Sequence, residues 1–271
     1  MKITALVENK SSGNSPGTNR AGLRTVHGLS LYIETNGRKL LFDLGPDNTL
    51  FENSAALGLD LATIDTVIIS HGHYDHGGAL ERFLEINHTA KIYVQSEAFQ
   101  KHYARVLLLN IDVGIDASLR NHPQIVLTDG DFEIDSGMRL ITVEDTSKCY
   151  SKANDTLFDD KGKDGFAHEQ SLIISGEPTV LITGCGHAGI VNIMEKAAQF
   201  EPGVCIGGYH LYNPTTKKTV ATELLDEIAA ELAGYDMRFY TCHCTGDVAF
   251  RHLAERVPGM EYLQCGGVVE V

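Results

Sequence analysis

Four side chains able to bind metals or move protons lie within one six-residue segment: His71, His73, Asp75 and His76. Residues 71, 73 and 75 alternate, so from an extended segment their side chains project the same way, while adjacent Asp75 and His76 can face a different point. Glycines inside and directly after the segment let the backbone bend and approach closely. Imidazole and carboxylate together suit Zn, Fe or Mn better than Ca or Mg. We therefore predict two neighbouring divalent metal ions, with zinc as the first candidate.

The place of this histidine cluster in the chain also favours a ligand-binding site. The cluster directly follows residues 66–70, an apolar run that predicts a strand buried on both faces. Open α/β sheets bind small molecules at the carboxyl ends of such strands. The alternative is a histidine-rich surface turn, which is not expected directly after a buried strand.

The surrounding elements follow from periodicity and turn signals. Residues 29–35 and 38–43 predict two strands joined by Asn36-Gly37, a type I′ hairpin signal. Further strands are expected at 66–70, 91–95, 180–183, 204–207, 238–242 and 261–263, with β structure also over 123–143. Helices are expected at 50–59, 79–84, 96–109, 190–200, 220–232 and 247–257. This order predicts an α/β fold in which two mixed sheets lie face to face with helices outside.

One segment, residues 146–165, differs in character from the rest of the chain. It is long, polar and rich in turn-forming residues. Loops of this length inside compact domains are usually functional or disordered. We predict a substrate-access loop, with a solvated surface excursion as the alternative.

Length and charge exclude several classes of partner. The chain has 271 residues and a formal net charge of −14, and a negative field of this kind repels nucleic-acid backbones. No apolar run approaches the roughly 18 residues of a membrane span, and no signal peptide is apparent. The six cysteines are expected to be reduced, and most of them to be small buried side chains. We therefore expect a cytoplasmic protein with a small-molecule substrate, no nucleic-acid partner and no membrane association.

The string SHGHYDHGG matches the HxHxDH signature of the metallo-β-lactamase superfamily, which the chain resembles over nearly its whole length. The resemblance implies a four-layer αββα sandwich formed by a single domain, residues 1–271. Phe42-Asp43-Leu44-Gly45 is similar to the first family motif, whose aspartate accepts a hydrogen bond from a ligand imidazole. Two later segments, ending at His187 and His243, are similar to the motifs whose histidines complete the two metal sites. The metal ligands that the resemblance implies are His71, His73, Asp75, His76, His187 and His243.

One position departs from the pattern of the family. The superfamily usually supplies a metal-bridging aspartate after the strand that corresponds to residues 204–207, and here His210 occupies that place. Three alternatives stay open: His210 ligates a metal, it contacts substrate, or the second metal site is weaker. Two metal ions are the expectation, and their number depends on this residue.

Four segments are similar to a subfamily named after 7,8-dihydropterin-6-methyl-4-(β-D-ribofuranosyl)aminobenzene-5′-phosphate synthase. They are His168–Leu172 (HEQSL), Gly184–Ile190 (GCGHAGI), Gly207–Leu211 (GGYHL) and Thr241–Gly246 (TCHCTG). His168 follows the polar segment 146–165, and we expect it to face the site and bind substrate. A surface position at a strand end is the alternative for His168.

The resemblance implies a metal-dependent hydrolase in which a metal-activated water attacks a small, phosphorylated or cyclic ester substrate. In that mechanism Asp75 orients the nucleophile or takes its proton, and His210 donates a proton or binds substrate. One alternative is a synthase-like transferase that uses the metals as a Lewis acid. Another is a di-iron redox protein, but such relatives have glutamate in place of His73 and carry a flavin domain for which the chain is too short.

Overall fold

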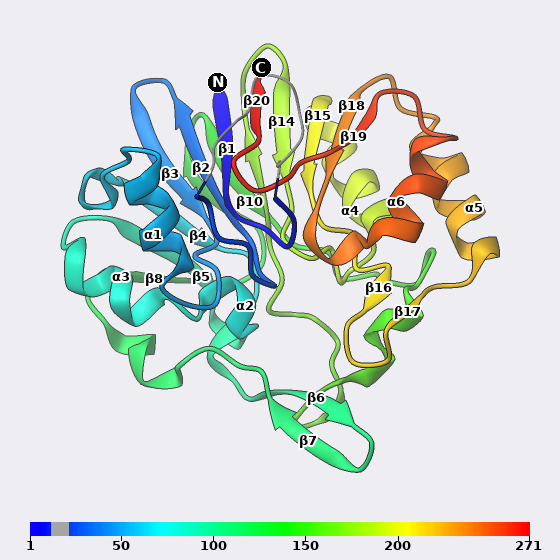
Figure 1. Cartoon of the computed structure of the whole chain (residues 1–271), viewed down its shortest axis with the longest axis horizontal. Coiled ribbons are helices and arrows are strands. Elements are labelled where there is room, and N and C mark those ends of the chain that lie inside the picture. The colour runs from blue at the N-terminus through cyan, green and yellow to red at the C-terminus, as the bar shows by residue number, and fades with distance from the viewer. Residues whose placement is uncertain (12–21) are drawn as a thin grey trace. The chain divides into compact units, whose positions relative to one another are not determined.

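The computed structural model describes residues 1–11 and 22–271. The chain folds into two compact units, whose elements are labelled in Figure 1. Unit 1 comprises Met1–Gln100, Gly114–Thr128 and Leu263–Val271, and unit 2 comprises Lys101–Val113 and Asp129–Tyr262. Each unit combines β-strands with helices, as the sequence predicts. The expectation of a single domain over residues 1–271 stays a prediction.

Unit 1 is built on a seven-stranded mixed sheet. Its strands lie in the order β20 (Val268–Glu270), β1 (Lys2–Val7), β2 (Ser30–Thr35), β3 (Arg38–Phe42), β4 (Thr66–Ile69), β5 (Lys91–Gln95) and β8 (Ile125–Thr128). The pairs from β20 to β3 are antiparallel and those from β3 to β8 are parallel. The predicted hairpin is confirmed: Asn36 and Gly37, between β2 and β3, have φ of 49° and 74°, as a type I′ turn requires.

The parallel strands of unit 1 are buried, and this packing holds the carboxyl end of β4 in place. β4 is buried over its whole length, and its side chains are apolar after Thr66 because a parallel strand is covered on both faces. α1 (Thr49–Ala56) and α3 (Leu80–Ile86) supply Leu50 and Phe83 to an apolar cluster that also contains Val67 and Ile69 of β4. The carboxyl end of β4, where the histidine cluster begins, is therefore firmly held.

Unit 2 contains a second seven-stranded mixed sheet. Its order is β19 (Met260–Tyr262), β18 (Arg238–Thr241), β15 (Pro202–Gly207), β14 (Thr179–Ile182), β13 (Ser171–Ile174), β10 (Met138–Ile141) and β9 (Phe132–Asp135). The pairs from β14 to β19 are parallel, and those from β9 to β14 are antiparallel. Three helices, α4 (Ile190–Ala197), α5 (Thr222–Leu232) and α6 (Asp247–Ala254), pack their apolar residues into one cluster with this sheet. The predicted alternation of strands and helices after residue 171 is confirmed.

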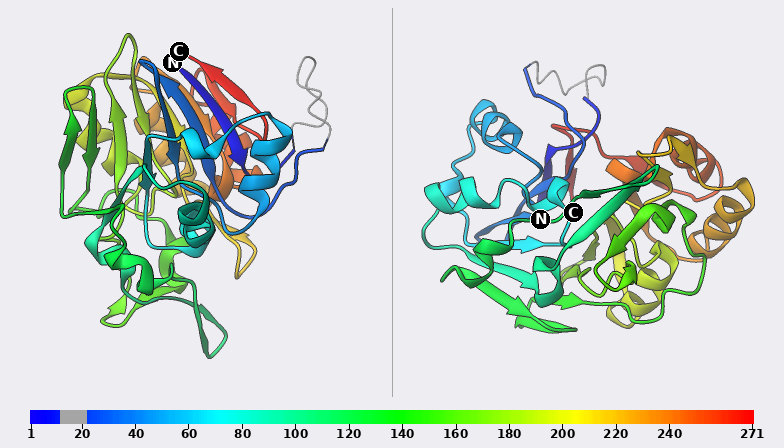
Figure 2. Two further views of the ribbon diagram at one scale, coloured as in Figure 1. Left: turned by 90° about the vertical axis from the view of Figure 1, so that its left-hand side faces the viewer. Right: turned by 90° about the horizontal axis from the view of Figure 1, so that it is seen from below.

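The helix expected at residues 96–109 is wrong. A short 3₁₀ helix, Ser96–Phe99, is followed by the hairpin of β6 (His102–Val106) and β7 (Leu109–Asp112), whose tip projects from the body of unit 2 (Figures 1 and 2). β6 pairs with β11 (Leu157–Asp159), which lies some fifty residues further along the chain. Local periodicity cannot reveal a long-range pairing of this kind, and here the pairing overrides helix propensity.

The segment 146–165 is more ordered than the predicted access loop. It contains a 3₁₀ helix, Lys152–Thr156, followed by β11 and β12 (Gly162–Lys163). These strands belong to a four-stranded sheet with the order β12, β11, β6 and β7. Residues 146–165 are therefore a folded part of unit 2, and their role in substrate access stays a prediction.

A separate pair of short strands in unit 2 is formed by β16 (Tyr212–Asn213) and β17 (Lys218–Thr219).

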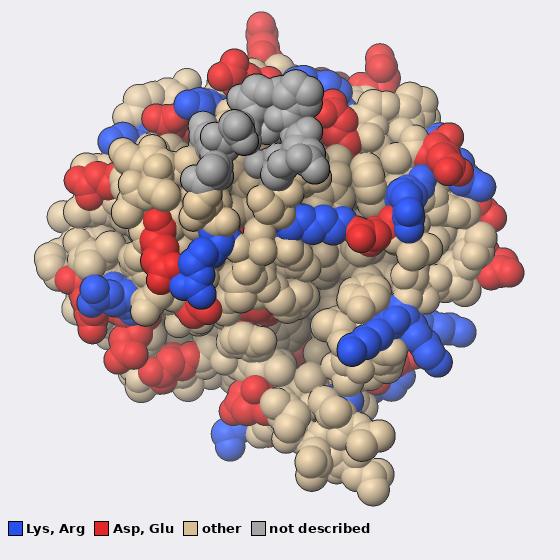
Figure 3. All heavy atoms as spheres, in the orientation of Figure 1, with Lys and Arg blue, Asp and Glu red and all other residues tan. Residues whose placement is uncertain are grey.

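The surface agrees with the charge of the sequence. On the face drawn in Figure 3, acidic side chains are interspersed with lysine and arginine, and the basic residues do not form one continuous face. Among the helices that the structure describes, none has the length and apolar composition needed to cross a membrane.

Candidate metal centre

The histidine cluster of unit 1 lies where β4 ends. His73 is still extended, with φ −89° and ψ 143°, and a short helix, α2 (Tyr74–Gly77), begins directly after it. The alternation expected for three side chains therefore reaches only His71 and His73, because Asp75 and His76 lie in a helical turn. Glycine is required after that turn, since a Cβ at Gly78 would lie 2.4 Å from the carbonyl oxygen of Pro46.

The cluster brings its donor groups close together. The ring centroid of His71 lies 4.6 Å from that of His73 and 4.2 Å from that of His76, and all three side chains are buried. Asp75 Oδ2 is 3.8 Å from Nε2 of His76 and 3.3 Å from Nε2 of His27. The four residues that the sequence singled out are therefore gathered within unit 1. His27 is an additional neighbour that the motif does not contain.

Asp43 organises this cluster through three hydrogen bonds. Its Oδ1 accepts the backbone N–H of Ser70 at 2.7 Å, and its Oδ2 accepts the Ser70 hydroxyl at 2.7 Å and Nδ1–H of His76 at 2.6 Å. Asp43 is fully buried and has a left-handed backbone, with φ of 62°. A non-glycine residue keeps such a backbone conformation only where surrounding contacts hold it, and residues of this kind are concentrated at functional sites.

This network determines which nitrogens can bind a metal. His76 donates Nδ1–H to Asp43, so the lone pair of the neutral ring is on Nε2. Ser70 gives its single hydroxyl proton to Asp43, so its oxygen accepts from Nδ1 of His71 at 2.8 Å. His71 therefore also presents the lone pair of Nε2. The donor set of unit 1 thus fits a divalent metal ion, because hydrogen bonds fix the orientation of both rings and leave Nε2 of each as the possible ligand atom.

In unit 2, His187 is held in the same manner. Its Nδ1 donates to Oδ1 of Asn154 at 2.9 Å, and the amide orientation is fixed because Nδ2 of Asn154 donates to the His187 carbonyl, also at 2.9 Å. The ring of Phe166 stacks on the imidazole with an interplanar angle of 2°. In a neutral His187 ring the lone pair is therefore on Nε2, the nitrogen that could bind a metal.

Glu169 fixes the backbone that carries His187. Its Oε1 accepts the N–H of His187 and its Oε2 that of Ala188, each at 2.8 Å. Burial raises the pKa of Glu169 to about 7, and the two N–H donors act in the opposite direction. Glu169 and Asn154 were not assigned a role from the sequence, although Glu169 lies in the HEQSL segment. Both contact His187, which lies 18 residues from Glu169 and 33 residues from Asn154.

Replacing Glu169 with glutamine should destabilise the protein. The glutamine NH₂ would face a backbone N–H, so one buried donor would lose its acceptor, at a cost of about 1–3 kcal/mol. Urea unfolding at neutral pH measures this cost, with Glu177→Gln, an exposed change on the same unit, as the control. An unchanged midpoint for Glu169→Gln would show that the two hydrogen bonds do not support the fold.

His210 and His243 lie on strained backbone in unit 2. Both are buried and have positive φ, 43° and 51° respectively. The Ser151 hydroxyl donates to the carbonyl of His210 at 2.6 Å, and the N–H of His210 donates to Sγ of Cys244 at 3.2 Å. A Cβ at Gly208 would lie 2.6 Å from that sulfur, so the close approach requires glycine.

Two cysteines lie among these histidines. Candidate ligand atoms of Cys185, His187 and His210 lie within 4.8 Å of one another, and those of Cys185, His243 and Cys244 do so as well. The sequence led us to expect that most of the cysteines are small buried side chains. Their burial is confirmed for Cys185 and Cys244, but their position beside three histidines was not anticipated.

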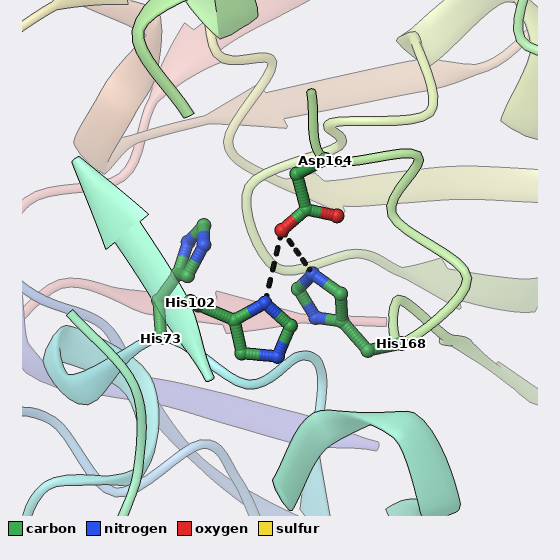
Figure 4. A group of neighbouring side chains, drawn as sticks. All are labelled: His73, His102, Asp164 and His168. Atoms are coloured by element: carbon green, nitrogen blue, oxygen red, sulfur yellow. Dashed lines mark hydrogen bonds and ion pairs between the residues drawn. The ribbon is translucent and has the colours of Figure 1, made fainter. Parts of the chain in front are cut away.

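His168 is also buried and not at the surface, and it lies within hydrogen-bond distance of Asp164 together with His102 (Figure 4). Burial lowers the pKa of His168. Burial also acts to raise the pKa of Asp164, but hydrogen bonds from His102 and His168 outweigh it, so that pKa lies well below its usual range. Neither His102 nor Asp164 was singled out from the sequence, since no local pattern links them to His168.

The chain is similar to known proteins in sequence and in fold. Residues 23–147 match the model of the Metallo-beta-lactamase superfamily. The solved structure of a metal-dependent hydrolase of the beta-lactamase superfamily aligns with 100% of this chain and 99% of its own, at a TM-score of 0.81 and 26% identity. The chain thus has the metallo-β-lactamase fold, and both the fold class and the family resemblance indicated by the motifs are confirmed.

Two proteins of Methanocaldococcus jannaschii are similar in sequence. An uncharacterized protein is 28% identical, over 84% of this chain and 88% of its own length. The second is 7,8-dihydropterin-6-methyl-4-(beta-D-ribofuranosyl)-aminobenzene-5'-phosphate synthase, which is 26% identical over 100% of this chain and 96% of its own length. The subfamily resemblance indicated by the four short segments is confirmed by this second protein.

Proposed function

We propose that the chain is a metal-dependent hydrolase of a small ester substrate, either phosphorylated or cyclic. The proposed ligands of two divalent ions, zinc before iron or manganese, are His71, His73, Asp75, His76, His187 and His243. The observation that carries the proposal is the set of hydrogen bonds by which Asp43, Ser70 and Asn154 hold three of these rings as neutral ligands. A metal-binding histidine almost always donates its other ring N–H to such an acceptor, which fixes its tautomer and orientation.

The six proposed ligands would hold ions whose chemistry is to lower the pKa of water toward neutrality and so to supply hydroxide. Asp75 is the proposed proton acceptor, because it lies in a short helix beside His76 and is only slightly exposed. His210 is the proposed proton donor or substrate contact in place of the usual bridging aspartate, and His168 the proposed substrate contact. The positive φ of His210 supports a functional role.

A second function has one specific observation in its favour. The relative aligned over the full chain is named a synthase, and in such a reaction the metals would act as a Lewis acid without hydrolysing an ester. The solved structure aligned over the full chain is described as a metal-dependent hydrolase, and we therefore give hydrolysis precedence. The six free cysteines support a reducing, cytoplasmic setting for either reaction.

Removal of metal should abolish hydrolysis reversibly. We expect dialysis against a chelator to eliminate turnover of an aryl phosphodiester or a lactone, and zinc, iron or manganese to restore it. Release of product from a panel of these two ester classes measures the effect, with metal content determined on the same samples. Turnover that persists in metal-free protein contradicts the proposal, and an inactive metal-loaded protein favours the synthase alternative.

A further inference from the structure

A second group of buried metal-binding side chains, none of them among the six proposed ligands, lies in unit 2. It consists of His102, Asp164 and His168. The four-stranded sheet brings them together: β6 begins at His102, which pairs with Asp159 of β11, and the chain reaches Asp164 directly after β12. The N–H of Asp164 donates to the carbonyl of Leu157 on β11. These backbone contacts fix the positions of the three side chains.

The geometry of the group is close. Oδ2 of Asp164 lies 2.9 Å from Nδ1 of His102 and 3.2 Å from Nε2 of His168 (Figure 4). All three residues are at least nine-tenths buried, at 2%, 9% and 2% exposure. Oδ1 of Asp164 accepts the N–H of Phe166 at 2.7 Å, so the carboxylate cannot rotate and Oδ2 remains between the two rings.

The Asp164 carboxylate is held by imidazole groups. Within the part of the chain that the structure describes, the ion-pair partners of Asp164 are these two histidines, and neither lysine nor arginine pairs with it. A buried carboxylate without a cation is costly, and it is stabilised by pairing or by coordinating a metal.

We propose that His102, Asp164 and His168 bind one divalent transition-metal ion of the zinc class. Ligands at about 2.0–2.2 Å from one ion are separated by roughly 2.8–3.6 Å, depending on the angle at the ion. The two nitrogen–oxygen distances here, 2.9 Å and 3.2 Å, lie in that range. All three candidate ligand atoms lie within 4.8 Å of one another. Two imidazoles and a carboxylate suit Zn, Fe or Mn.

Within unit 2 these three side chains supply the protein ligands of the proposed ion. The proposal goes beyond the hydrolase function, because it uses none of the six residues proposed there as ligands.

The test is the number of zinc ions bound per chain. After equilibrium dialysis of the full chain against buffered Zn²⁺, we expect Asp164→Asn and His102→Gln/His168→Gln to retain one ion fewer than the unaltered protein. Asp160→Asn and His88→Gln, which change exposed residues of the same types, should retain the full number. Equal zinc content in the unaltered protein and in the folded His102→Gln/His168→Gln variant overturns the site.

Crystals provide a readout that does not depend on the variants. With data collected at the zinc edge, we expect an anomalous peak beside Oδ2 of Asp164 in zinc-soaked crystals and none in crystals of His168→Gln. The absence of a peak in the unaltered protein overturns the proposal. A change at His71 should leave this peak in place, so failure of the hydrolase proposal and failure of this site are distinguishable.

Discussion

Replacing His71 with alanine should remove metal and turnover together. His71 is a proposed metal ligand through Nε2, because Ser70 accepts its Nδ1–H, and alanine offers no ligand atom in its place. We expect the hydrolysis rate at saturating substrate to fall at least about a thousandfold, which corresponds to about 4 kcal/mol of barrier. Metal content should fall in parallel, because the remaining ligands form an incomplete site.

The measurement combines metal analysis with the rate of ester hydrolysis on one preparation. His88→Gln, an exposed histidine of the same unit, is the matched control and should retain both metal and activity. His73→Ala should behave as His71→Ala does. A His71→Ala protein that keeps its full metal content and rate would falsify the assignment of this residue as a ligand.

Asp43→Asn should weaken metal binding and also the fold. The asparagine NH₂ is a donor, and it would face either the Ser70 N–H or both the Ser70 hydroxyl and Nδ1–H of His76, all of which now donate to the carboxylate. The loss of such an outer partner typically costs 10–100-fold in metal affinity. We expect a loss of that size, together with about 1–3 kcal/mol of stability in the metal-free protein because a buried donor loses its acceptor.

Competition with a zinc-binding dye gives the affinity, and urea unfolding of chelated protein gives the stability. Asp129→Asn, an exposed change in the same type of residue, should alter neither quantity. His76→Gln provides the complementary variant, since it removes the ring while keeping the carboxylate. If Asp43→Asn matches Asp129→Asn in both measurements, Asp43 does not orient the ligand ring.

The part of the site that was predictable is the part encoded within a few residues. His71, His73, Asp75 and His76 are close in sequence and follow a strand whose apolar side chains alone show that it is buried. The β2–β3 hairpin was predictable for the same reason, because two residues with positive φ define its turn. Family resemblance extended the prediction to His187 and His243.

The parts that were missed depend on partners far apart in the chain. The 96–109 segment became a hairpin because β6 pairs with β11, and the same pairing placed His102 beside Asp164, 62 residues away. Asn154 lies 33 residues from His187, and its own sequence surroundings are typical of a surface turn. No periodicity or motif records such contacts.

The amino-acid sequence by itself determined the chemistry available to this protein: a segment of potential metal ligands after a buried strand, an acidic composition and a metallo-β-lactamase fold. Tertiary structure decided which atoms can take part in that chemistry. A histidine can bind a metal through either nitrogen, and the choice depends on what the other nitrogen contacts. For His76 that contact is Asp43, 33 residues earlier, and only the folded chain brings the two within 2.6 Å.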